Sequence, residues 1–69
     1  MYEVGNGVIR EYVNLGAGNY LAIGEVVSIH EDAHGETLYT IMFEDGATKV
    51  YTENVMNNPR VIVTEKVIW

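Results

Sequence analysis

Two histidines four residues apart give the spacing in this chain that most resembles metal chemistry. His30-Glu31-Asp32-Ala33-His34 has the form H-E-x-x-H, in which two imidazoles on one helix face bind zinc and the glutamate activates a water. The residues before His30 are Val-Val-Ser-Ile, which favour a strand over a helix. We therefore interpret residues 30–36 as an exposed hairpin loop and predict no metal and no cofactor. A weak metal site formed by His30 and His34 stays open as an alternative.

Nucleophilic catalysis has no support in the residue types. The chain has no cysteine, and its one serine, Ser28, lies in a strand-like segment without a nucleophile-elbow motif. No glycine-rich phosphate-binding motif is present either. The adjacent carboxylates Glu31/Asp32 and Glu44/Asp45 are typical of solvated turns. The sequence predicts a protein that is not an enzyme.

The elements that would position these residues are short strands. Seven glycines and one proline separate apolar segments at intervals of about ten residues, a rhythm typical of small all-β domains. The alternation predicts strands over 4–13, 20–29, 37–43, 48–51 and 60–63, with Glu44-Asp45-Gly46 as a hairpin turn. Continuation of the last strand to Trp69 stays open. Residues 52–56 predict one helical turn with Thr52 as its N-cap. We expect residues 1–69 to form a single five-stranded antiparallel β-barrel.

Two motifs resemble the centre of a Tudor domain. They are Gly24-Glu25-Val26-x-x-Ile29 and Tyr39-x-Ile41-x-Phe43-Glu44-Asp45-Gly46. The resemblance implies an SH3/Tudor-like barrel that binds a partner, and it implies a methyl-lysine cage at Ala22 or Ile23, Phe43 and Lys49. Only Phe43 is aromatic among those positions, so Tyr20 and Tyr51 would have to supply further rings. The ordinary alternative is that Phe43 and the tyrosines belong to the core.

A second resemblance suggests a small oligomeric enzyme. Thr48-Lys49-Val50-Tyr51 is similar to the pore strand V-Q-I-Y of the plasmid-type dihydrofolate reductases, which are SH3-like barrels. That resemblance implies a pore lined by Lys49 and Tyr51. Lys49 stands where that family has its ligand-contacting glutamine.

The charge of the chain favours a basic partner. Ten acidic and four basic residues give a formal charge of −6, and residues 11–48 contain no Lys or Arg. Such a surface repels phosphate backbones, so we predict no direct nucleic-acid binding. We expect an acidic face that meets a basic protein, as in an inhibitor or regulator of a nucleic-acid-binding protein; solubility is the ordinary alternative. Its residues are Glu25, Glu31, Asp32, Glu36, Glu44 and Asp45.

The C-terminal tail is more apolar than one strand face can bury. If it continues as a strand, Val61, Val63, Val67 and Trp69 share one face and Ile62 and Ile68 the other. Trp69 is therefore a candidate anchor for a homo-oligomer or a protein partner, and closure of the tail onto the same chain is the equal alternative. The predicted binding residues are Tyr20, Tyr39, Phe43, Asp45, Tyr51 and Trp69. No membrane-spanning run and no secretory signal are visible, which predicts a cytoplasmic location. A host regulator and a viral protein both fit this chain.

Overall fold

The fold is a single antiparallel sheet with one short helical turn. The computed structural model describes residues 2–69 and contains five strands: β1 (Gly7–Tyr12), β2 (Tyr20–Glu31), β3 (Thr37–Phe43), β4 (Thr48–Thr52) and β5 (Val61–Thr64). The helical turn α1 (Glu53–Met56) lies between β4 and β5. The strand order is β4-β3-β2-β1-β5, so consecutive strands are neighbours except that β5 returns to pair with β1.

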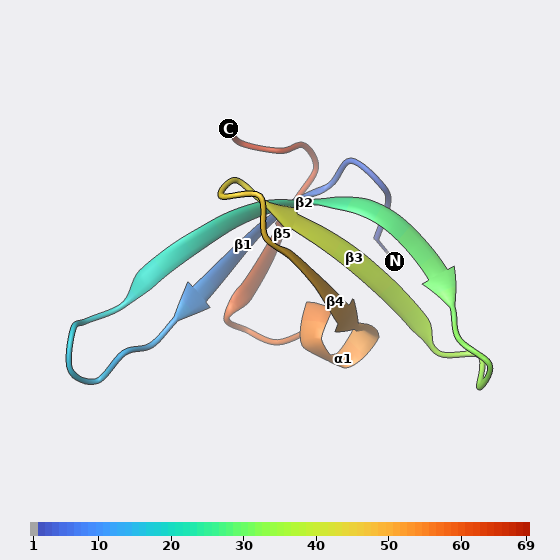
Figure 1. Cartoon of the computed structure of the whole chain (residues 1–69), viewed down its shortest axis with the longest axis horizontal. Coiled ribbons are helices and arrows are strands. Elements are labelled where there is room, and N and C mark those ends of the chain that lie inside the picture. The colour runs from blue at the N-terminus through green and yellow to red at the C-terminus, as the bar shows by residue number, and fades with distance from the viewer. Residues whose placement is uncertain (1) are drawn as a thin grey trace.

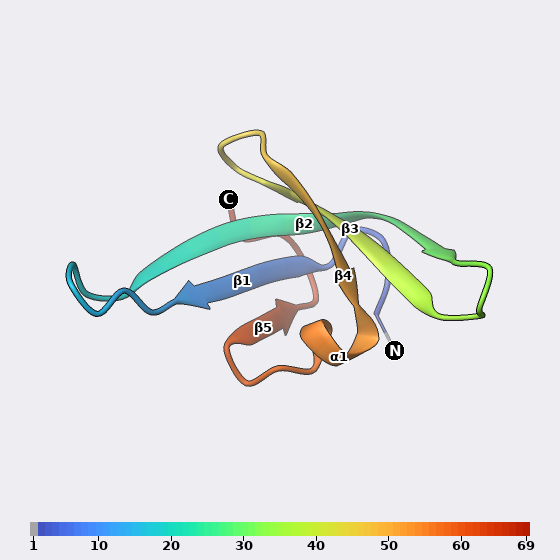
Figure 2. The same ribbon diagram turned by 60° about the horizontal axis from the view of Figure 1, so that its bottom comes forward.

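The sheet is strongly curved but open. Strands β2 and β3 arch over α1, while β4 and β5 form the two edges (Figures 1 and 2). Across residues 2–69 no ladder joins β4 to β5, so the predicted barrel is not closed, although the predicted five antiparallel strands and the helical turn are confirmed. Instead α1 contacts both β4 and β5. The helix lies where a fifth strand pairing, between β4 and β5, would otherwise close the barrel.

The core lies on the inner face of this arch. Alternate residues of each strand point inward, as the two-residue period requires, and the buried set is Val8, Val26, Tyr39, Ile41, Phe43, Tyr51, Met56 and Val61. A β-bulge between Val26 and Ser28 adds one residue to β2. Because the bulge shifts the alternation, Ile29 packs on the same core as Val26 although the two are three residues apart.

Gly24 occupies the centre of the sheet because no larger residue fits there. It pairs with Val8 on one side and Phe43 on the other. A Cβ atom at this position would come within 2.9 Å of both Ile41 Cγ2 and Phe43 Cδ1. The glycine that resembles part of a Tudor motif thus lets two core side chains lie directly against the backbone of β2.

Local signals set the turn and the helix as expected. Gly46 has a φ of +89° in the turn after β3, and the Asp45 carboxylate accepts the Ala47 amide at 2.9 Å. Thr52 is the N-cap of α1, its hydroxyl accepting the Val55 amide at 3.3 Å. Strand β3 ends at Phe43 as predicted, and β4 ends one residue later than predicted, at Thr52.

The first strand is shorter than predicted, and the last is shifted by one residue. Strand β1 begins at Gly7 rather than residue 4, because Gly5 has a φ of +97° and its amide donates to the Val26 carbonyl. Strand β5 ends at Thr64. There the Thr64 hydroxyl donates to the Lys66 carbonyl at 2.6 Å, which bends the chain. The last strand thus lies within one residue of its predicted bounds, 60–63, and it does not continue to Trp69.

The tail folds back close to Gly7. A Cβ at Gly7 would lie 2.2 Å from Thr64 Oγ1 and 2.6 Å from the Lys66 carbonyl oxygen. Beyond this contact Ile68 and Trp69 are each about half exposed, at 55% and 52%. The tail is thus fixed at its start by a close backbone approach, while its last residues face solvent.

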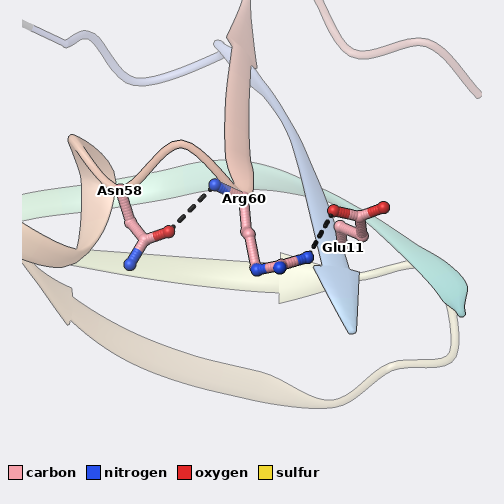
Figure 3. Close-up of polar contacts among 3 residues, drawn as sticks. All are labelled: Glu11, Asn58 and Arg60. Carbon is pink, nitrogen blue, oxygen red and sulfur yellow. Dashed lines mark hydrogen bonds and ion pairs between the residues drawn. The ribbon is translucent and has the colours of Figure 1, made fainter. Parts of the chain in front are cut away.

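Polar contacts tie the beginning of β5 to β1. Arg60 forms an ion pair with Glu11 at 2.9 Å, and the Asn58 side chain accepts the Arg60 amide at 2.9 Å (Figure 3). The Glu11 amide donates to the Arg60 carbonyl. Both charged side chains are substantially exposed, so the ion pair fixes geometry more than it adds stability.

No helix in residues 2–69 is long and apolar enough to cross a membrane.

Candidate binding groove

A groove lies between the loop end of the β1–β2 ladder and the β3–β4 turn. It has a volume of about 430 Å³. Residues from β1, β2, β3, the turn and β4 contribute to it: Tyr12, Tyr20, Leu21, Ala22, Ile23, Phe43, Glu44, Asp45, Ala47 and Lys49. The curvature of the sheet brings these two segments together, since β2 pairs with both β1 and β3.

Two stacked tyrosines form the aromatic side of the groove. Tyr12 and Tyr20 are cross-strand partners at the end of the β1–β2 ladder. Their ring centroids are 5.0 Å apart and the planes are inclined by 19°. Tyr20 is 57% exposed, so the pair offers a flat apolar surface that is open to a ligand.

Phe43 belongs to the core and also reaches the groove. It is 5% exposed and packs edge-on against Tyr51, with ring centroids 6.4 Å apart. Tyr51 is itself buried and does not line the groove. The groove is therefore built on the wall of the hydrophobic core, which holds its apolar side rigid.

Charged groups of both signs line the turn side. Glu44 and Asp45 come from the β3–β4 turn and Lys49 comes from β4. Asp45 is held in place by its hydrogen bond to the Ala47 amide, and the Glu44 amide donates to the Ile23 carbonyl across the groove wall. The two carboxylates can receive a cation, while Lys49 suits a carbonyl or carboxylate oxygen.

Behind the tyrosine pair lies a cation that the sequence analysis did not single out. The Arg10 guanidinium carbon is 5.4 Å from the Tyr12 ring centroid and 5.5 Å from that of Tyr51. Its Nε is buried without a hydrogen-bond partner among the described residues. Burial, followed by interaction with Tyr12, raises the pKa of Tyr51 to about 12, although the Arg10 charge opposes this rise. The Arg10 guanidinium thus lies near both aromatic rings, behind the groove.

The predicted binding residues are only partly brought together. Tyr20, Phe43 and Asp45 line the groove, whereas Tyr51 lies behind it in the core. Tyr39 is buried near α1, where its hydroxyl donates to Glu53 at 2.9 Å. Burial and then that hydrogen bond raise the pKa of Tyr39 to about 12.

Trp69 lies on the exposed tail and does not line the groove. Its exposure leaves it available to a partner, but on a surface separate from the one that holds Tyr20. The tail and the groove are therefore two different candidate contact regions.

All the positions that the Tudor resemblance implied lie along this one groove. Ala22, Ile23, Phe43 and Lys49 each line it. Tyr12 and Tyr20 supply the other rings, from neighbouring positions of the first hairpin. Tyr12, Leu21 and Ala47 were not predicted. The only signal for Tyr12 was its place near the end of the first predicted strand, and the register that sets it opposite Tyr20 comes from the structure.

The acidic residues fall into separate groups. Glu31, Asp32 and Glu36 lie in and beside the β2–β3 hairpin, whereas Glu44 and Asp45 lie in the turn at the opposite end of β3. Seven residues of β3 separate the two groups, a span of about 20 Å. Glu25 lies on β2, opposite Met42 of β3. Only the second group borders the groove.

The residues considered for chemistry are also placed. His30 ends up on β2 and His34 in the following turn, so H-E-x-x-H is not helical here. Across residues 2–69 no cluster of three metal-ligating side chains occurs. His30 borders a second hollow, of about 450 Å³, with Tyr2, Ile29, Glu31 and Thr37. Lys49 is exposed and Tyr51 buried on β4, so the two do not share one open surface.

No protein-family model, curated protein or solved structure matches the chain.

Proposed function

We propose that this domain is a non-enzymatic interaction module, an open relative of SH3/Tudor-like barrels, whose groove binds a basic segment of another protein. The observation that carries the proposal is the combination of an exposed tyrosine pair with two turn carboxylates in one groove. Five antiparallel strands with a helical turn before the last one support the SH3/Tudor-like assignment.

The groove chemistry suits an arginine or lysine with an apolar neighbour. A cation over the Tyr20 ring gains about 0.5–2 kcal/mol, depending on how far it is desolvated. The carboxylates of Glu44 and Asp45 lie along the same groove and add charge-assisted hydrogen bonds. The formal charge of −6 also favours encounter with basic proteins. A regulator of a nucleic-acid-binding protein would meet its partner through such a site.

A Tudor-type reader of methylated side chains is the second candidate. It is favoured by the placement of Ala22, Ile23 and Phe43 along the groove that also holds the stacked tyrosines. Methylation removes hydrogen-bond donors from lysine but keeps its charge. A reader would therefore bind a trimethyl-lysine peptide more tightly than the unmodified one, whereas a general basic-segment binder would not.

The test uses two synthetic lysine- and arginine-rich peptides of one sequence, unmodified and trimethylated, titrated into the isotope-labelled domain. We expect amide chemical-shift changes at residues 20–23 and 43–49, and an affinity that falls with added salt. Asp45→Asn retains an oxygen that can accept the Ala47 amide but removes the charge, so we expect binding to weaken by about 2–5-fold without loss of fold. Glu44→Gln should act alike.

Glu36→Gln is the matched control, because Glu36 is an exposed acid at the far hairpin. It should leave binding unchanged. If Glu36→Gln weakens binding as much as Asp45→Asn, or if the shifts map to residues 30–36, the interaction is diffuse electrostatics and the groove is not the site.

A further inference from the structure

The two edges of the sheet differ in how far they are protected from another strand. Strand β5 has four residues, follows Pro59 and begins at Val61, whose amide is already used by the Asn58 carbonyl. Strand β4 has five residues, and three of them in succession, Thr48 to Val50, are exposed. Short edges and nearby proline limit unwanted pairing. Strand β4 is one residue longer and has no proline beside it, and its one charged residue is Lys49.

The hydrogen-bond register shows which groups of β4 are free. The Phe43 amide donates to the Ala47 carbonyl, so Phe43 and Ala47 form a hydrogen-bonded pair at the end of the β3–β4 ladder. Hydrogen-bonded and non-hydrogen-bonded pairs alternate along an antiparallel ladder. Lys49 and Tyr51, which face Ile41 and Tyr39, therefore bond to β3. The N–H and C=O groups of Thr48 and Val50 point to the open edge.

The side chains on the outer face of this edge are self-complementary. Thr48, Val50 and Thr52 lie on the face opposite the core, and Val50 is 58% exposed. When a second β4 is placed antiparallel about a twofold axis at Val50, the two valines face each other and Thr48 faces Thr52 of the other copy. Threonine–threonine and β-branched pairs are favourable across strands. In the same register the free N–H and C=O groups of one Val50 face those of the other, so the two residues can form a hydrogen-bonded pair.

We propose that the β4 edge is a self-association site, at which a second copy of this chain pairs antiparallel about Val50 and continues the sheet. A register centred on Lys49 would set two lysines directly opposite each other, which is unfavourable. The register about Val50 overlaps all of β4. Because Val50 lies on the outer face and does not line the groove, this proposal does not depend on the proposed function.

Disulfide trapping tests both the edge and the register. The chain has no cysteine, so a single substitution introduces the only thiol. In a hydrogen-bonded antiparallel pair the Cα atoms lie about 5.5 Å apart, within the range for a disulfide. We expect Val50→Cys to form a covalent dimer under mild oxidation about tenfold faster than either control.

The controls are Ile62→Cys and Thr48→Cys. Ile62 is an equally exposed apolar residue, at 55%, on the other edge strand. In the proposed register the two Thr48 residues lie about 13 Å apart, too far for a disulfide to form between them. Because Thr48 faces Thr52 of the other copy, an equimolar mixture of Thr48→Cys and Thr52→Cys should form the mixed dimer. Equal rates for Val50→Cys and Ile62→Cys would overturn the proposal, and so would Thr48→Cys dimers that form as fast as Val50→Cys dimers.

Light scattering on the unmodified chain gives the independent readout. We expect twice the mass of one chain, with Val50→Lys reducing it to a single chain and both Ile62→Lys and Trp69→Ala leaving it unchanged. Circular dichroism shows whether each variant is folded. A monomeric unmodified chain up to millimolar concentration would overturn the proposal. So would a monomeric Trp69→Ala variant beside a dimeric Val50→Lys variant, because the tail would then be the interface.

Discussion

Substitution of Gly24 by alanine should destabilise the domain although it adds a single methyl group. The new Cβ would lie 2.9 Å from Ile41 Cγ2, 2.9 Å from Phe43 Cδ1 and 3.0 Å from the Met42 carbonyl oxygen. Ile41 is fully buried and Phe43 is 5% exposed, so neither side chain can move into solvent to make room. The backbone oxygen belongs to the neighbouring strand and is fixed by the β2–β3 ladder.

The size of the effect follows from two opposing terms. Overpacking of a filled core costs about 1–3 kcal/mol, and replacing glycine by alanine recovers about 0.4–1 kcal/mol through the unfolded chain. The free energy of unfolding should therefore fall by about 1–2 kcal/mol. For a domain of this size each kcal/mol lowers the melting temperature by about 4–8 °C. A decrease of about 4–16 °C is expected.

Thermal and urea unfolding followed by circular dichroism measure this change. Gly16→Ala is the matched control, since Gly16 is exposed, has no positive φ and meets only the Asn14 side-chain oxygen at 3.7 Å. It should be neutral or slightly stabilising. If Gly24→Ala is as stable as Gly16→Ala, the close packing of Ile41 and Phe43 on β2 is not present in solution.

Three further predictions concern the helix cap and the buried tyrosines. Thr52→Ala should cost about 1 kcal/mol, because the Val55 amide loses its partner; a urea midpoint equal to that of the unmodified chain would contradict the cap. The pKa values of Tyr39 and Tyr51 are raised from 10.0 to about 12 in the folded state. Their contribution to the free energy of unfolding should therefore be fully present below pH 10 and fall as the pH rises toward 12. Urea midpoints measured across that range test this, and Tyr39→Phe should remove part of the slope; a flat profile would refute it. Arg10→Met should cost about 0.5–2 kcal/mol through the lost cation–π contacts, and it should raise the pKa of Tyr51 further, as ultraviolet titration of the phenolate would report.

The amino-acid sequence by itself determined the local elements. The alternation of residues 37–43 gives β3 with the bounds that were predicted, and Asp45-Gly46 forms the expected turn. Thr52 caps α1 as predicted. Strand β3 depends on the two-residue alternation of its side chains, and the turn depends on a glycine that tolerates positive φ. The helix cap depends on a hydroxyl three residues before the amide that donates to it. Each is set within a few residues of chain.

The tertiary structure decided the curvature, the open edges and the groove. The bulge after Val26 and the pairing of β5 with β1 place Tyr12, Tyr20 and Asp45 along one groove, and they leave Glu31 far from it. No local pattern indicates which strands pair or where a sheet stops, because these depend on contacts between residues distant in the chain. The tail shows the same limit: its alternation left open whether the last strand continues to Trp69, and the Thr64–Lys66 hydrogen bond and the close approach to Gly7 end the strand at Thr64.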